Sequence, residues 1–127
     1  MQDQSLTRGT ALFRDVTGAV GEQLLDEIGA ISPDLARFVR GFAFGEVMAR
    51  PGLDIRERER LNVAVLTALG YSLPQLRLHI HGALNVGVTE AEVVEIILQI
   101  ALYAGFPAAL NGMATAKDVF AERRAKL

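Results

Sequence analysis

The chain of 127 residues contains no cysteine and no tryptophan, and its aromatic residues are two tyrosines and six phenylalanines. Without cysteine the protein cannot form a disulfide, a thiolate metal site or a cysteine-based peroxidase centre. Because aromatic residues are few, the core must be built mainly from alanine, leucine, valine and isoleucine.

Several other signals are missing from the sequence. No apolar run reaches membrane-spanning length, and the polar start, MQDQSLTRGT, lacks the apolar region of a signal peptide. The net charge of −2 gives no reason to expect nucleic acid or an anionic membrane as a partner. The sequence has no glycine-rich phosphate loop, nucleophile elbow or dinucleotide-binding fingerprint. We therefore expect a cytoplasmic protein.

Apolar residues are abundant, because half of the chain is hydrophobic and the mean hydropathy is +0.26. The length fits a single domain over residues 1–127, with residues 1–5 frayed. A domain of this size has a large surface relative to its volume. We therefore expect partner subunits to cover part of the apolar surface.

Helical signals follow one another along the whole chain, and no segment shows the alternation of a strand. Short helices are expected from Leu6 to Thr17 and from Glu22 to Ile28, with Gly18 and Gly21 between them. Later helix starts are predicted at Ser32-Pro33-Asp34, Asp54-x-x-Glu57, Ser72-x-x-Gln75 and Thr89-x-x-Glu92. The last helix is expected from Pro107 to Arg124. The sequence thus predicts an all-α fold of about six helices.

Glu46 occupies an unusual position in the helix expected to end near Ala49. It follows Phe42 by four residues and Val39 by seven, so it falls on an apolar face of a 3.6-residue helix. An unpaired buried carboxylate is costly, so the helix end could instead be wet, with Glu46 near Arg50. The helical phase favours a Glu46 that is buried or lines a pocket.

Glu59 lies at the start of the next helix, on the same side as Val63 and Leu66. We expect it to be a solvated first-turn acid that the helix dipole favours. The residues that follow, 61–69, are almost wholly apolar, which predicts a helix segment buried on all sides.

Two histidines lie near the end of the helix that begins after Ser72. His79 flanks the apolar stripe of that helix. His81 is turned by roughly 200° around the helix from His79, so the two side chains cannot enter one pocket together. Two histidines at this spacing are a poor metal signature, and we expect no metal site. A helical histidine beside apolar residues is more often a core or interface residue than a catalyst. His79 with Glu46 is an acid–base candidate.

Two segments together resemble the carboxymuconolactone decarboxylase family: FGEVMARPGLDIRER and LRLHIHGALNVGVTEAEVVEIILQIALYAGFPAALN. The resemblance covers about residues 35–122. It implies an all-α fold shared with alkylhydroperoxidase D-type enzymes, assembled as trimers or hexamers. In the peroxidase branch a CxxC pair precedes a histidine. The corresponding YSLPQLRLH keeps His79 but has no thiol, which excludes peroxidase activity.

In the decarboxylase branch the matching positions are Glu46, Arg50, His79, Asn85 and Tyr103. The resemblance implies that His79 is the catalytic acid and that Glu46 orients His79 or tunes its pKa. It implies a substrate-binding role for the others, with Arg50 and Asn85 as donors to a developing oxyanion. We add His81 to the substrate-binding candidates.

The function implied is cofactor-free decarboxylation of a 4-carboxymuconolactone-like unsaturated lactone acid, in the protocatechuate branch of aromatic catabolism. The expected partner is a small-molecule carboxylic acid, and the expected assembly is a homotrimer or homohexamer. Two alternatives stay open: another small-molecule lyase or isomerase on the same scaffold, and a non-catalytic oligomeric binding protein. His79 and a carboxylate within hydrogen-bond reach would favour an enzyme.

Overall fold

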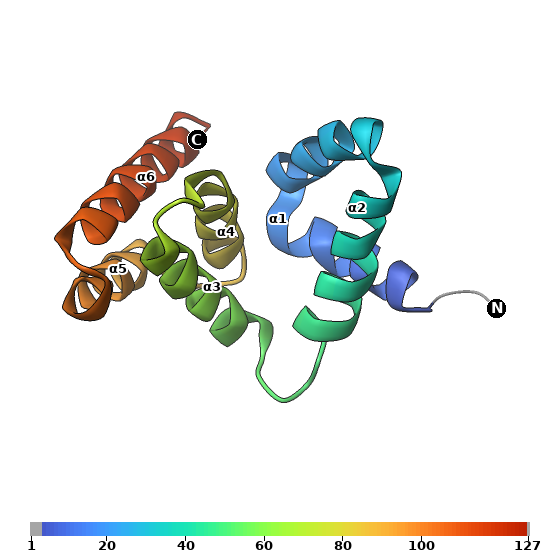
Figure 1. The fold of residues 1–127 in the computed structure, drawn as a ribbon, viewed down its shortest axis with the longest axis horizontal. Helices are drawn as coiled ribbons and strands as arrows, with labels where there is room; N and C mark the ends of the chain where they lie inside the picture. Colours follow the sequence, from blue (N-terminus) through green and yellow to red (C-terminus); the bar gives the residue numbers. More distant parts are fainter. Residues whose placement is uncertain (1–3, 127) are drawn as a thin grey trace. The chain divides into compact units, whose positions relative to one another are not determined.

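The structure is a computed structural model that describes residues 4–126. These residues form helices joined by short connections and contain no strand, so the predicted all-α class is confirmed (Figure 1). They divide after Ile55 into two compact units, unit 1 (residues 4–55) and unit 2 (residues 56–126). No helix within residues 4–126 is long and apolar enough to cross a membrane.

Unit 1 contains α1 (Gln4–Ile31), α2 (Pro33–Phe38) and the π-helix η1 (Val39–Met48). The break expected near Gly18 is present, since Gly18 has φ 64° and ψ −155° within α1. The predicted start of α2 is also confirmed, because the Ser32 side chain accepts a hydrogen bond of 3.2 Å from the Leu35 amide.

Helices α1 and η1 pack with their backbones in close contact. A side chain at Gly9 would collide with the backbone carbonyl of Arg40, and one at Gly45 would collide with that of Ser5. Beside this contact Phe13 and Phe44 pack edge to face, with ring centroids 5.0 Å apart. The close approach of two glycines therefore allows the aromatic core of unit 1 to form.

The π-helical geometry of η1 overturns the predicted burial of Glu46. A π-helix bonds residue i to residue i+5, so residues seven apart, such as Val39 and Glu46, no longer share a face as they do in an α-helix. The buried residues of η1 are Gly41, Phe44 and Gly45, whereas Phe42 and Glu46 are exposed in the single chain. The predicted burial of Glu46 is therefore wrong for the single chain, and its place in a pocket stays a prediction.

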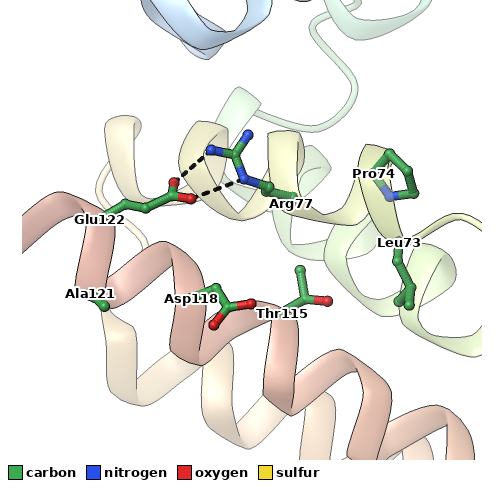
Figure 2. A pocket seen from close by; sticks show the side chains of 7 residues that line it. All are labelled: Leu73, Pro74, Arg77, Thr115, Asp118, Ala121 and Glu122. Atoms are coloured by element: carbon green, nitrogen blue, oxygen red, sulfur yellow. Dashed lines mark hydrogen bonds and ion pairs between the residues drawn. The ribbon is translucent and has the colours of Figure 1, made fainter.

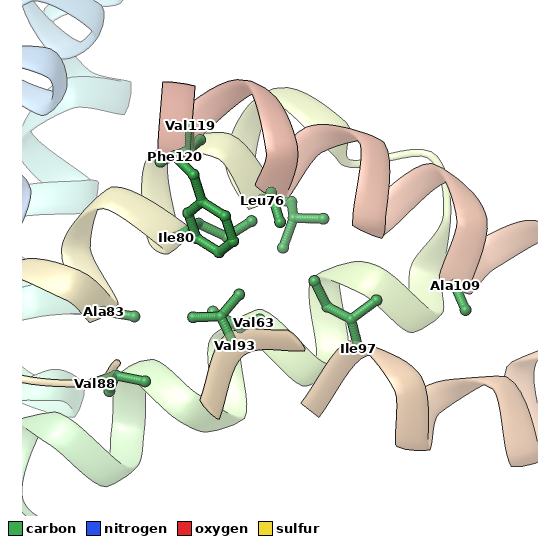
Figure 3. Packing of buried hydrophobic residues seen from close by; sticks show 11 residues of the cluster. Val63, Leu76, Ile80, Ala83, Val88, Val93, Ile97, Ala109, Val119 and Phe120 are labelled. Atoms are coloured by element: carbon green, nitrogen blue, oxygen red, sulfur yellow. The ribbon is translucent and has the colours of Figure 1, made fainter. Parts of the chain in front are cut away.

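Unit 2 contains α4 (Leu73–Asn85), α5 (Glu90–Ala104), α6 (Phe106–Ala125) and, apart from its first residue, α3 (Ile55–Leu69). Each helix contributes apolar side chains to one core, and Figure 3 shows them converging. The core residues are Val63, Leu76, Ile80, Ala83, Val88, Val93, Ile97, Ala109, Ala116, Val119 and Phe120. Fully burying one valine, leucine or isoleucine side chain contributes roughly 1.5–3 kcal/mol, so this core holds unit 2 together.

The ends of these helices follow the sequence signals, with one exception. The capping box of Thr89 and Glu92 is confirmed by both of its hydrogen bonds. Gly87 ends the α4 region at φ 99°, which a glycine adopts without strain. Ser72 stands at the N-cap of α4 but makes no side-chain cap bond. Its hydroxyl donates instead to the Leu66 carbonyl at 3.2 Å, so the predicted Ser72 capping box is wrong.

Helix α3 has two contrasting faces. Glu59, Val63 and Thr67, spaced by four residues, are all 0% exposed. Leu61, Val65 and Leu69 have the same spacing but are 56%, 51% and 47% exposed. The prediction of a segment buried on all sides is therefore wrong for the single chain, because the core lies against one face only. The opposite face is an apolar stripe of the kind that a partner subunit covers.

Candidate active site

His79 on α4 contacts a carboxylate of α3. Its Nδ1 lies 2.9 Å and 2.8 Å from the two carboxylate oxygens of Glu59. A carboxylate can only accept hydrogen bonds, so Nδ1 carries a proton and donates it to Glu59. The nitrogen whose protonation can change during a reaction is therefore Nε2. The His79 side chain is 16% exposed, which leaves part of the ring at the surface of unit 2.

Glu59 is the residue that sequence reasoning misjudged. It is completely buried, although we expected a solvated first-turn acid. An isolated carboxylate would be costly there, and the hydrogen bonds from His79 and from Asn62 compensate. The signal was present in the sequence, because Glu59 precedes Val63, a core residue, by four positions.

His81 belongs to a second cluster, between α4 and α6. Its side chain is 4% exposed, so it does not face solvent in the single chain. Arg123 Nη1 lies 3.3 Å from His81 Nδ1, and Glu122 Oε2 lies 3.0 Å from Nε2. Because arginine only donates, Nδ1 of His81 accepts a hydrogen bond from Arg123. The proton of the ring is therefore on Nε2, which donates a hydrogen bond to Glu122. The two histidines thus point to different partners, as their spacing predicted.

Burial and the neighbouring charged side chains together lower the pKa of His81. Burial lowers the pKa of His81; the hydrogen bond to Glu122 opposes this effect, while the charges of Arg77 and Arg123 add to it. Arg77 donates to both carboxylate oxygens of Glu122, at 3.2 Å and 2.7 Å. This pair of bonds is the main reason why the pKa of Glu122 is lowered. The lowered pKa favours the neutral form of His81, and its contacts with Glu122 and Arg123 connect α4 to α6.

A groove of about 560 Å³ lies between α4 and α6, next to the second cluster (Figure 2). The Arg77–Glu122 pair crosses one end of it. Its lining residues are Leu73, Pro74, Arg77, Thr115, Asp118, Ala121 and Glu122. The groove thus adjoins the carboxylate partner of His81, and neither His79 nor Glu59 lines it.

The structure distributes the other predicted site residues over both units. Asn85 is exposed at the end of α4, and its Oδ1 accepts a hydrogen bond of 3.0 Å from Arg123, which joins it to the His81 cluster. Tyr103 is 94% exposed near the end of α5. Glu46 and Arg50 lie in unit 1 and are both exposed. Their roles in binding or catalysis stay predictions.

A sequence model of the carboxymuconolactone decarboxylase family matches residues 33–118, which is more than half of the chain. The chain belongs to this family. The matched region begins with α2 in unit 1 and continues into α6 in unit 2, so it includes Glu59, His79 and His81.

Three relatives show how far the similarity extends. The chain is 42% identical to 4-carboxymuconolactone decarboxylase of Acinetobacter baylyi over 96 residues, which are 76% of this chain and 71% of that protein. It is 36% identical to an uncharacterized 15.0 kDa protein in the nqo9–nqo10 intergenic region of Paracoccus denitrificans over 120 residues, 94% and 90% of the two chains. It is 40% identical to nitrosuccinic acid decarboxylase npaB of Metarhizium robertsii over 72 residues, 57% of this chain and half of that protein.

Proposed function

We propose that the protein is a decarboxylase that acts on an unsaturated lactone acid of the 4-carboxymuconolactone kind. The observation that carries the proposal is the contact between the buried Glu59 carboxylate and Nδ1 of His79. This contact provides an oriented acid–base group at the surface of unit 2 in a family with decarboxylase members. A histidine held by a buried carboxylate within hydrogen-bond reach favours an enzyme over a binding protein.

The reaction needs one bond cleavage and one proton transfer. The bond between the substrate and its carboxylate carbon breaks, CO₂ leaves, and the electron pair passes into the unsaturated lactone. Nε2–H of His79 then gives its proton to the product carbon, and the ring regains a proton from water. The Glu59 carboxylate stabilises the protonated ring and holds Nδ1–H throughout.

The other groups have supporting roles in this proposal. Arg50 and Asn85 are the proposed donors to the developing oxyanion, and Tyr103 is a proposed substrate-binding residue. Glu59 takes over the orientation of His79, the role that sequence reasoning gave to Glu46. We propose that the two units act as one domain in a cytoplasmic homotrimer or homohexamer. The apolar stripe of Leu61, Val65 and Leu69 supports contact between subunits.

A second candidate substrate comes from the Metarhizium robertsii relative. That protein is named for the decarboxylation of nitrosuccinic acid, a small acid rather than a lactone. The same proton transfer from His79 would serve it, because a nitro group also accepts the electron pair that CO₂ leaves behind. The 4-carboxymuconolactone assignment remains first, since that relative is matched over a larger share of both chains.

The test is an assay of CO₂ release by the purified protein. The panel contains 4-carboxymuconolactone, related unsaturated lactone acids and nitrosuccinic acid, with His79→Gln as the matched control. We expect release from a lactone acid by the wild type and a loss of roughly a hundredfold or more in the variant. Release from nitrosuccinic acid alone would select the second candidate. No release from any acid, with tight binding of one of them, would support a binding protein instead.

A further inference from the structure

Asn62 is a third side chain in contact with the Glu59–His79 pair. It lies three residues after Glu59 on α3, so both side chains project from the same side of that helix. Its Nδ2 is 3.0 Å from Oε1 of Glu59 and 3.5 Å from Nδ1 of His79. The amide therefore lies beside both members of the pair.

The two contacts of Asn62 compete, and their geometry decides between them. Nδ1 of His79 already donates to Glu59 at 2.8 Å, so it cannot accept from Asn62 in the same state. The shorter contact, to Oε1 of Glu59, is the hydrogen bond. Because a carboxylate only accepts, the NH₂ end of the amide faces Glu59, which fixes the orientation of the Asn62 side chain.

Glu59 Oε1 consequently receives two donors, one from the helix that carries Glu59 and one from His79 on α4. Asn62 restrains the carboxylate from α3, the helix that also carries Glu59, while the imidazole of His79 approaches from α4. A carboxylate that can rotate would allow the ring to rotate with it, so that the reactive nitrogen would no longer keep one direction. Hydrogen bonds behind a functional group commonly set its orientation in this way.

We infer that Asn62 is a positioning residue, which fixes the Glu59 carboxylate so that His79 keeps its Nδ1 proton and exchanges protons through Nε2. This inference rests on the proposed function for its catalytic consequence, but the hydrogen-bonded state of His79 can be measured without any substrate. Asn62 itself touches no reacting atom in this account.

The decisive measurement is ¹⁵N NMR of the imidazole rings in the assembled protein. The chain has two histidines, so the spectrum contains two rings, and His81→Gln identifies the signals of His79. In the wild type we expect a proton on Nδ1 of His79 that exchanges slowly with water. Asn62→Leu keeps the volume of the side chain but removes the donor. In this variant we expect the exchange to accelerate about tenfold or more, because one hydrogen bond to a charged group is lost.

Activity provides a second readout. With the substrate identified, Asn62→Leu should lower kcat by roughly tenfold with KM within about twofold of wild type, because orientation and not binding is lost. Asn62→Gln, which keeps an amide donor, should recover part of both effects. Asn111→Leu, a change of the same kind at an exposed position of α6, is the matched control and should behave as wild type.

The outcomes separate the two proposals. Unchanged exchange of the Nδ1 proton in folded Asn62→Leu would overturn the positioning role, whatever happens to activity. If that variant does not fold, Asn62→Ala is measured by the same criterion. A wild type that decarboxylates none of the acids would end the proposed function, while the NMR comparison would still decide the role of Asn62.

Discussion

The two histidines of α4 have the same kind of partner and opposite surroundings. At His79 the carboxylate of Glu59 is completely buried and the imidazole is 16% exposed. At His81 the imidazole is 4% exposed, and the carboxylate of Glu122 is 37% exposed. Proton exchange with a substrate requires the ring to be within reach, so the arrangement at His79 suits catalysis. The arrangement at His81 suits a structural connection between α4 and α6.

Removing each ring should separate these roles, and the largest effect is expected at His79. His79→Ala should lower kcat by roughly a hundredfold or more, the contribution of a general acid, while the protein still folds. His81→Ala should change turnover per folded molecule by no more than about twofold. Steady-state kinetics and circular dichroism of both variants check this. Similar losses of kcat in the two variants would contradict a catalytic role for His79 and a structural role for His81.

Stability should also respond to the loss of the His81 ring. His81→Ala leaves a cavity and removes one hydrogen bond each from Glu122 and Arg123, so we expect a loss of about 1–3 kcal/mol in the free energy of unfolding. Urea unfolding at constant protein concentration measures it, because an assembly makes the midpoint concentration-dependent. An exposed change on the same pair of helices, Gln75→Ala, is the control. A His81→Ala protein as stable as the wild type would show that the cluster is not a structural connection.

A smaller effect should appear with pH. The pKa of His81 is lowered in the folded protein, so below its ordinary value of 6.5 the unfolded chain binds the proton more strongly than the folded one. Stability is therefore full above about pH 6.5 and falls as the pH drops through this value toward the folded pKa. The lowered pKa of Glu122 acts in the same direction at lower pH, since its stabilisation is lost as the pH falls below 4.5.

The variant that tests this linkage is His81→Gln, which keeps polar atoms and cannot titrate. Between about pH 7.5 and about pH 5.5 the thermal midpoint of the wild type should fall by more than that of His81→Gln. Equal shifts in the two proteins would assign the acid sensitivity to other groups.

The sequence was sufficient to predict the helices, because their signals are local. The Ser32 cap, the Thr89–Glu92 capping box and the glycine after α4 each act within a few residues of the chain. The core stripe of α4 was also predictable, since Leu76, Ile80 and Ala83 follow the helical period and are all 0% exposed. Membership of the family then supplied His79 as the histidine of interest.

The candidate site was only half predictable, because it depends on which helices meet. Glu59 and His79 are twenty positions apart, and no local rule brings their helices together. The choice of Glu46 assumed α-helical phase in a segment that is π-helical, which no pattern in the sequence indicated. The exposed stripe on α3 raises a similar difficulty. Its apolar residues predict that it is buried, but they do not identify the surface that covers it.

The most direct test of the central claim neutralises each carboxylate without changing its size. In Glu59→Gln the group that stabilises protonated His79 loses its charge, so kcat should fall at least tenfold. In Glu122→Gln the same change occurs beside His81, and kcat should stay within about twofold of the wild type. Both are measured as CO₂ release per folded active molecule on the substrate that the panel identifies. Equal activity of Glu59→Gln and Glu122→Gln would contradict the assignment of His79 and Glu59 as the reactive pair.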